Sequence, residues 1–224
     1  MASKSSPSVK KMNSRGAFIA FEGIDRSGKS TQAQLLARKL EAENIKVQHI
    51  RFPERTTPCG LLIDDYLRTK KELRDEVIHL LFSANRWEMS SQIEQWLDEG
   101  ITVIADRYLY SGITYSAAKG LPFTWCCAPD EGLLAPDLVL YFDIDPALAS
   151  NRGEYGGERY ERLEFQNEVR RQYKKLICPS HWTTIDASAD VESLAIEVNK
   201  VVNPLLENCL SGLIGQRTFS SRIY

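Results

Sequence analysis

The residues with the clearest chemical meaning stand at positions 23–30, Gly-Ile-Asp-Arg-Ser-Gly-Lys-Ser, where four residues separate the first glycine from Gly-Lys-Ser. In a loop with this spacing, successive backbone N–H groups point inward and bind phosphate oxygens, helped by the N-terminus of the following helix. Lys29 would reach the terminal phosphates of a nucleoside triphosphate, and the hydroxyl group of Ser30 would bind Mg²⁺. The spacing therefore predicts a nucleotide-binding loop.

Two charged residues, Asp25 and Arg26, stand inside this loop. Phosphoryl transfer spreads negative charge over the oxygens of the group in transit, and an arginine placed there accelerates the reaction by about 10³–10⁵-fold. We therefore interpret Arg26 as a catalytic residue, with a solvated arginine on the outer rim as the alternative. Because a carboxylate repels phosphate, we expect Asp25 to accept a hydrogen bond from a hydroxyl group of a second substrate. An internal pairing of Asp25 with Arg26 that only shapes the loop is the alternative for this residue.

The loop must be positioned by the elements on either side of it. Residues 17–24 read as a buried strand, and residues 29–43 have leucines at helical spacing. Further apolar segments of strand length follow, separated by helical patterns, at 45–53, 101–108, 137–144 and 181–188. This alternation predicts an α/β fold of the P-loop NTPase type, a doubly wound five-stranded parallel sheet with helices on both faces.

One domain is expected to occupy residues 17–208, between a flexible N-terminal tail, 1–16, and a C-terminal tail, 209–224. No internal segment is rich enough in Gly, Pro or Ser to divide this domain. The polar, glycine-rich segment 152–162 predicts a short lid that would close over the site and exclude water.

The overall composition restricts the partners and the location. A formal net charge of −2 gives no general attraction for nucleic acid, and no apolar run approaches the ~18 residues of a membrane span. We therefore expect neither nucleic acid nor membrane as a partner. The five cysteines lack Cys-x-x-Cys spacing, which favours reduced thiols in a cytoplasmic protein. The basic, Ser-rich tail at 1–16 leaves a nuclear or mitochondrial pool as the alternative.

Charged residues follow the predicted strands at their carboxyl ends, the edge where α/β sheets bind ligands. Arg55 follows the second strand and Arg107 the third, so both are expected near Lys29. Because a guanidinium group matches phosphate oxygens with two parallel hydrogen bonds, this pair predicts a second substrate that already carries a phosphate. Asp106 and Asp143 each end an apolar strand, as a Mg²⁺-supporting carboxylate does, and the arginine next to Asp106 favours that residue.

A helix beginning near residue 73 is expected to turn one apolar stripe toward the core. The stripe consists of Leu73, Val77, Leu80 and Ala84. Phe82 and Arg86 fall nearly opposite it and next to each other, so the ring could stack on a nucleobase while the guanidinium group bonds the base edge. Burial of both helix faces, with no binding role for this pair, is equally consistent with the spacing.

Motifs that occur in the order and context of a known family are FEGIDRSGKSTQ, FPER, LLFSANRWE, DRY, APDLVLYFDI and RGEYGGERYE. From about residue 17 to 208 the sequence resembles thymidylate kinases of the eukaryotic type, within the P-loop nucleoside monophosphate kinase superfamily. The resemblance implies a transferase that phosphorylates dTMP to dTDP in dTTP synthesis, with ATP as co-substrate and Mg²⁺ as cofactor. It also implies a homodimer.

The resemblance further implies roles for individual residues. The catalytic residues would be Arg26, Lys29 and Asp106, and the metal ligands would be Ser30 and Asp106. The ATP-binding residues would be Gly23, Gly28, Lys29, Ser30, Thr31 and Arg152. The dTMP-binding residues would be Asp25, Arg55, Phe82, Arg86, Arg107, Ser111, Tyr115, Tyr160 and Gln166.

Within the dTMP site, the resemblance implies that Asp25 binds the 3′-hydroxyl group, Phe82 stacks on thymine and Arg86 bonds its O4 atom. Arg55 and Arg107 would hold the phosphate, and Tyr115 would block a 2′-hydroxyl group. The implied alternatives to Arg26 as the catalytic arginine are Arg159 and Arg162 in the lid, and the Phe52–Pro53 bond would be cis.

Two other function classes remain open on the residues alone. A deoxynucleoside kinase would need a carboxylate to accept the proton of a 5′-hydroxyl group, and Glu54 or Asp25 offers one. The second class is a nucleotide-binding regulatory protein without useful catalysis. A GTPase of this class would need Asn-Lys-x-Asp, and NKVV at 199–202 lacks the aspartate.

Overall fold

Parallel strands form the centre of the protein and lie in the order β2-β3-β1-β4-β5 across one sheet. The computed structural model describes residues 15–152, 156–176, 181–212 and 218–220. The strands are β1 (Phe18–Gly23), β2 (Val47–Arg51), β3 (Thr102–Asp106), β4 (Leu138–Asp143) and β5 (Trp182–Asp186). The strands expected from the sequence are therefore confirmed, each somewhat shorter than its apolar segment.

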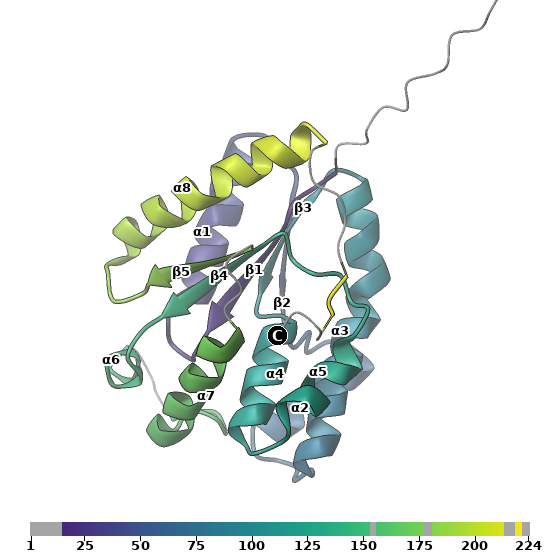
Figure 1. Cartoon of the computed structure of the whole chain (residues 1–224), viewed down its shortest axis with the longest axis vertical. Helices are drawn as coiled ribbons and strands as arrows, with labels where there is room; N and C mark the ends of the chain where they lie inside the picture. The colour runs from purple at the N-terminus through teal and green to yellow at the C-terminus, as the bar shows by residue number, and fades with distance from the viewer. Residues whose placement is uncertain (1–14, 153–155, 177–180, 213–217, 221–224) are drawn as a thin grey trace, which may run out of the picture.

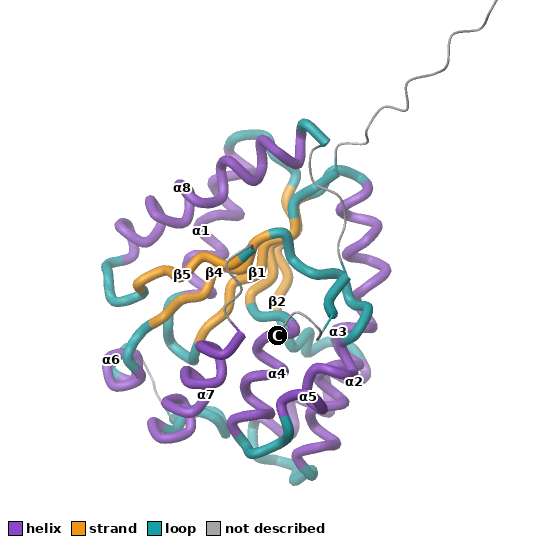
Figure 2. The backbone as a smooth tube through the Cα atoms, viewed as in Figure 1, coloured by secondary structure: helices purple, strands orange, loops and turns teal. Residues whose placement is uncertain are grey.

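Helices cover both faces of this sheet, which confirms the doubly wound α/β fold (Figure 1). One face carries α1 (Lys29–Ala42) and α8 (Val191–Leu210), and the other carries α3 (Asp75–Asp98), α4 (Leu109–Ala118) and α7 (Leu163–Leu176). Shorter elements connect them: α2 (Pro58–Leu67), α5 (Phe123–Cys127), the 3₁₀ turn η1 (Ala128–Asp130) and α6 (Pro146–Ser150). Figure 2 shows the strands enclosed between these layers, which is why β1 and β3 are buried at every residue. Within the part of the chain that the structure describes, no helix is long and apolar enough to cross a membrane.

A buried carboxylate in β1 attaches two helices to the sheet. Glu22 is fully buried, and its Oε1 accepts hydrogen bonds from the backbone N–H groups of Tyr108 at 2.9 Å and Ser111 at 3.2 Å, in the first turn of α4. Its Oε2 accepts from Oγ of Ser111 at 2.6 Å and from the hydroxyl group of Tyr173 in α7 at 2.7 Å. Because a buried charge is stable only when it is fully hydrogen-bonded, these donors lock α4 and α7 onto β1.

The apolar stripe expected to face the core from the helix near residue 73 was assigned to the wrong side. Leu73 precedes α3, whose first residue is Asp75, and Val77 and Leu80 are exposed. The buried side of α3 instead carries polar residues, among them Asn85 and Arg86. The reason is physical: a hydrophobic period shows that one helix face is apolar, but it does not show what covers that face.

Both ends of the described chain pack on the domain beyond the 17–208 limits expected from the sequence. Arg15 is buried and forms an ion pair with Asp137 at 2.6 Å. Phe219 is also buried, and its backbone N–H group donates to the carbonyl oxygen of Leu133 at 2.7 Å. The remaining positions of the two expected tails, 1–14, 213–217 and 221–224, lie outside the described residues, as do residues 153–155 of the expected lid.

Candidate functional site

The loop between β1 and α1 turns sharply at two glycines. Gly23 has a φ angle of 142° and Gly28 one of 95°, values that residues with a side chain rarely adopt. A Cβ atom at Gly23 would lie 2.6 Å from the carbonyl oxygen of Phe142 in the adjacent strand β4. The glycines therefore let the loop pass close to the sheet and present the N-terminus of α1, which Gly28 caps.

Lys29 lies beneath this loop and is almost fully buried. Its Nζ atom donates to the carbonyl oxygen of Ile24 at 2.5 Å and to Oγ of Ser27 at 3.2 Å. Burial, with a smaller contribution from the positive charge of Arg107, lowers the pKa of the amine from 10.5 to about 7. The loop thus holds its lysine folded against its own backbone.

Ser30 and Asp106 meet where α1 begins and β3 ends. Oγ of Ser30 donates to Oδ2 of Asp106 at 2.5 Å. The Oδ1 atom of Asp106 is buried and has no hydrogen-bond partner among the described residues. A hydroxyl group beside a buried, unpaired carboxylate oxygen matches the hard oxygen ligands of Mg²⁺, so these residues fit the expected metal. Asp143, the alternative from the sequence, forms an ion pair with Arg170 at 2.5 Å.

Two cavities open at the carboxyl edge of the sheet and share part of their walls. Residues that line the larger one include Arg26, Gly28, Lys29, Ser30, Thr31, Arg152 and Glu161. Residues that line the smaller one include Arg55, Phe82, Arg86, Ser111, Tyr115 and Tyr160. Both cavities are lined by Asp25, Arg51, Arg107 and Glu158. The cavities therefore meet at two arginines and two carboxylates.

The structure gathers the residues that the sequence assigned to ATP around the larger cavity and those assigned to dTMP around the smaller one. Three of the assigned residues line neither cavity. Gly23 belongs to the loop, Asp106 contacts Ser30, and Gln166 contacts Asp25 from α7.

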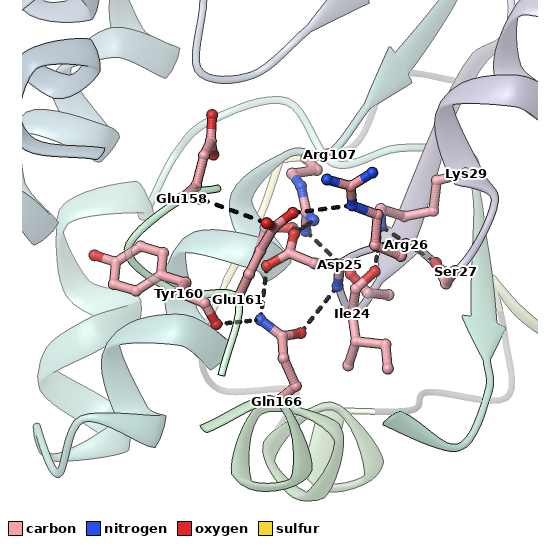
Figure 3. A network of polar contacts seen from close by, with 12 residues as sticks. Ile24, Asp25, Arg26, Ser27, Lys29, Arg107, Glu158, Tyr160, Glu161 and Gln166 are labelled. Carbon is pink, nitrogen blue, oxygen red and sulfur yellow. Dashed lines mark hydrogen bonds and ion pairs between the residues drawn. The ribbon is translucent and has the colours of Figure 1, made fainter. Parts of the chain in front are cut away.

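Asp25 and Arg26 each contact a residue from a distant segment (Figure 3). Asp25 forms an ion pair with Arg107, and its Oδ2 atom accepts a hydrogen bond from Nε2 of Gln166 at 2.6 Å. The backbone N–H group of Asp25 donates to Oε1 of the same glutamine at 2.9 Å. Nε of Arg26 donates to Oε1 of Glu161 at 3.0 Å. The loop's two charges are thus tied to the residue that follows β3, to α7 and to the lid.

Arg26 and Arg107 both have a left-handed backbone, with φ angles of 62° and 68°. For residues other than glycine such a conformation costs on the order of 1–3 kcal/mol and is concentrated at functional sites. Hydrogen bonds hold Arg107 in place: its backbone N–H group donates to Phe21 at 2.9 Å, and its Nη1 atom donates to the carbonyl oxygen of Gly23 at 3.0 Å. The strain supports a functional role for both arginines.

Arg86 is fixed at the inner end of the smaller cavity. Its Nε and Nη2 atoms donate to the buried carboxylate of Asp130 at 3.1 and 2.6 Å, and Oγ of Ser83 donates to the same carboxylate at 2.7 Å. A Cβ atom at Gly112 would lie 2.7 Å from Nη2 of Arg86, so only glycine leaves room for the guanidinium group. Phe82 stands one helical turn before Arg86 and lines the same cavity.

The rest of the smaller cavity is aromatic on one side and charged on the other. The guanidinium group of Arg107 lies 5.2 Å from the centre of the Tyr115 ring, which packs against the Tyr160 ring at 5.6 Å. Arg55, which also lines this cavity, forms ion pairs with Asp64 at 2.6 Å and with Glu158 at 2.8 Å. The Phe52–Pro53 bond in the wall is cis, as the resemblance implied.

The lid arginines differ in their placement. Arg152 lines the larger cavity and donates to the carbonyl oxygen of Ala187 at 2.8 Å. Arg159 forms an ion pair with Glu72 at 2.7 Å, and its guanidinium group lies 4.1 Å from the centre of the Tyr66 ring. Arg159 and the exposed Arg162 line neither cavity. The geometry therefore favours Arg26 over both as the arginine that faces a transferring group.

Sequence reasoning missed five residues of this site: Glu22, Arg51, Asp130, Glu158 and Glu161. A signal existed for two of them. Glu22 is a lone carboxylate in an apolar strand, and Arg51 ends the second strand as Asp106 ends the third. Glu158 and Glu161 lie in a loop, and Asp130 ends the short 3₁₀ turn η1, so no local period marks their side chains.

Comparisons with known proteins agree with this geometry. The family model described as "Thymidylate kinase" matches residues 21–198. The protein named thymidylate kinase from Schizosaccharomyces pombe is 47% identical over 194 residues, which cover 84% of this chain and 92% of that protein. The protein of the same name from Homo sapiens is 38% identical over 205 residues, which cover 90% of this chain and 97% of that protein. The solved thymidylate kinase of Candida albicans aligns with a TM-score of 0.81 at 35% identity, covering 92% of this chain and 96% of that one. The chain therefore belongs to the thymidylate kinase family, nucleoside monophosphate kinases that use ATP to phosphorylate dTMP.

Proposed function

We propose that the chain transfers the γ-phosphoryl group of ATP, bound in the larger cavity, to dTMP, bound in the smaller one. The observation that carries this assignment is the shared wall: Arg51 and Arg107 line both cavities, so phosphates bound in the two cavities would meet beside these arginines. The phosphate of the acceptor is already anionic, so the reaction needs no strong general base. Positioning and charge neutralisation then supply the rate, which is the arrangement that phosphoryl transfer requires.

The donor side is assigned to the loop. Its backbone N–H groups and Lys29 would hold the β- and γ-phosphates, and Arg152 would pack on adenine. Ser30 and Asp106 would hold Mg²⁺, which neutralises charge on the phosphate oxygens. The unpaired Oδ1 atom of Asp106 supports this metal site. Arg26 would stabilise the negative charge that develops on the group in transit.

The acceptor side is assigned to the smaller cavity. Arg55 and Arg107 would bind the dTMP phosphate, and both are now held by carboxylates that this anion would displace or share. Arg86 would donate to O4 of thymine, because the hydrogen bonds from its Nε and Nη2 atoms to Asp130 hold its guanidinium group in one orientation. Phe82 would stack on the base, and Tyr115 would exclude a 2′-hydroxyl group.

An acceptor screen tests this proposal. Purified protein with Mg²⁺–ATP is expected to convert dTMP fastest and dUMP more slowly, because uracil lacks the methyl group that fills the pocket. UMP is expected to react poorly, since its 2′-hydroxyl group meets the buried Tyr115, and dCMP poorly, since its amino group opposes Arg86. Turnover of thymidine but not of dTMP would identify a deoxynucleoside kinase, and nucleotide binding without turnover would favour the regulatory alternative.

We further propose a homodimer that pairs through α2 and α3. These adjacent helices expose large apolar side chains at Leu61, Leu62, Val77, Leu80 and Trp87, and a single copy leaves this surface in water. Sedimentation velocity should give the mass of two chains, and the double substitution Val77→Glu with Leu80→Glu should give one. A monomeric wild-type protein at micromolar concentration would contradict the dimer.

The proposed location is the cytoplasm. Cys126, Cys127 and Cys209 are buried thiols, and burial raises the pKa of Cys126 and Cys209 to about 11 and that of Cys127 to about 12. Thiols of this kind serve packing in proteins of reducing compartments.

A further inference from the structure

Glu161 holds two segments together through its two carboxylate oxygens. Its Oε1 atom accepts the hydrogen bond from Nε of Arg26 at 3.0 Å. Its Oε2 atom accepts hydrogen bonds from the backbone N–H groups of Gly156 and Gly157 at 2.9 and 2.8 Å. Figure 3 shows the carboxylate between the lid and the guanidinium group. The side chain of Glu161 is only 9% exposed, whereas that of Arg26 is 33% exposed.

A carboxylate in this place would weaken nucleotide binding, so its presence requires another role. Glu161 lines the larger cavity, where the triphosphate is proposed to bind, and like charges repel at short range. Lid closure alone does not need this charge, because neutral side chains can also accept hydrogen bonds from backbone N–H groups. The interaction that needs a carboxylate is the ion pair with Arg26, whose side chain is partly exposed.

The bond to Nε constrains the whole guanidinium group. Its five N–H donors lie in one rigid plane, so fixing the Nε–H direction also fixes the two Nη groups. An arginine on a flexible side chain otherwise loses rotamer entropy when it is ordered for the reaction. Glu161 therefore orders the guanidinium group of Arg26 in advance through its bond to Nε.

The residue next to Arg26 is tied to the lid in the same way. Nε2 of Gln166 donates to the carbonyl oxygen of Tyr160 at 2.9 Å and to Asp25 at 2.6 Å. Consecutive lid residues, Tyr160 and Glu161, therefore connect to consecutive loop residues, Asp25 and Arg26. The lid and the loop form one continuous polar network.

We infer that Glu161 is a positioning residue that orients the catalytic arginine and makes its orientation depend on the lid. The inference rests on the proposed role of Arg26 in phosphoryl transfer. Glu161 itself touches neither the donor phosphate nor the acceptor in this scheme. It acts on the reaction through Arg26, and its bonds to Gly156 and Gly157 join that arginine to the lid.

A double-mutant cycle tests the inference. Glu161→Ala in the full chain should lower kcat by about 10-fold or more with the KM for dTMP changed by less than about threefold. In the Arg26→Ala background the same substitution should change kcat by less than about twofold, because the guanidinium group that Glu161 orients is already missing. Glu161→Gln should also lower kcat, since an amide has one acceptor oxygen and cannot serve both Arg26 and the lid. Glu164→Gln, an exposed glutamate in the first turn of α7, is the matched control and should leave kcat unchanged.

Three results would overturn the inference. A Glu161→Ala effect of equal size in both backgrounds would make Glu161 a structural lid residue. An effect on KM alone would make it a substrate-affinity residue. Unchanged kcat in Arg26→Ala would remove the proposed role of Arg26, and with it the reason for Glu161. Only this last result also changes the proposed function, so the two failures are distinguishable.

Discussion

Replacing Arg26 with alanine is expected to lower kcat by on the order of 10²-fold or more, while the affinity for ATP stays nearly the same. Arg26 lines the larger cavity, and its Nε atom is bonded to Glu161, which holds the guanidinium group where negative charge develops in the proposed transfer. That charge is largest in the transition state, which is why the loss should appear in kcat. Single-turnover kinetics, with a separate titration of a fluorescent ATP analogue, measures both quantities.

The matched control for this experiment is Arg159→Ala in the lid. Arg159 lines neither cavity, and its partner Glu72 is largely exposed, so solvent screens this ion pair. Its substitution should therefore change kcat little. If Arg26→Ala retained full kcat and Arg159→Ala or Arg162→Ala did not, the catalytic arginine would lie in the lid. Melting curves must accompany each variant, because alanine at position 26 keeps the strained φ angle of 62°.

Replacing Arg107 with alanine is expected to reduce kcat/KM for dTMP by on the order of 10³-fold. Arg107 lines both cavities and is paired with Asp25, and its side chain is 15% exposed. Since about 1.4 kcal/mol corresponds to tenfold in rate, a loss of this size corresponds to about 4 kcal/mol of transition-state stabilisation. The loss has two parts: a phosphate ligand is missing, and Asp25 is left as an unpaired negative charge where the acceptor phosphate should bind.

Two further variants separate these parts. Arg55→Ala removes a phosphate ligand that lines only the smaller cavity, so kcat/KM should fall less than in Arg107→Ala. The double variant Asp25→Asn with Arg107→Ala should regain part of the activity, because the repulsive carboxylate is gone. A loss of less than about tenfold in Arg107→Ala would mean that its guanidinium group does not face the acceptor phosphate.

The strands and the glycine loop could be predicted from the sequence because both are local patterns. Apolar runs of strand length locate β1 to β5, and the spacing from Gly23 to Ser30 identifies the loop. The same reasoning failed on α3. The spacing of its apolar residues predicted a helix, but the side of the helix that is buried was predicted wrongly. Which side a helix buries depends on neighbours such as α2 and α4, which are placed by the tertiary structure.

The partners of the functional side chains could not be predicted for a related reason. Glu161 contacts Arg26 across 135 positions of sequence, and Asp130 contacts Arg86 across 44. No periodicity or spacing rule connects residues so far apart, and a loop carboxylate has the same local appearance whether it holds an arginine or faces water. The resemblance to a family located the residues that touch ligands, but it did not indicate what orients them.

The buried amine of Lys29 gives the phosphate loop an acid–base property of its own. Burial lowers its pKa to about 7, so its protonation changes with pH near neutrality. A bound triphosphate favours the protonated amine, so nucleotide binding takes up a fraction of a proton from the solvent. This fraction increases as the pH rises, because less of the free amine is already protonated. The affinity of this kinase for its donor is therefore linked to the acidity of its surroundings, weakening in base and strengthening in mild acid.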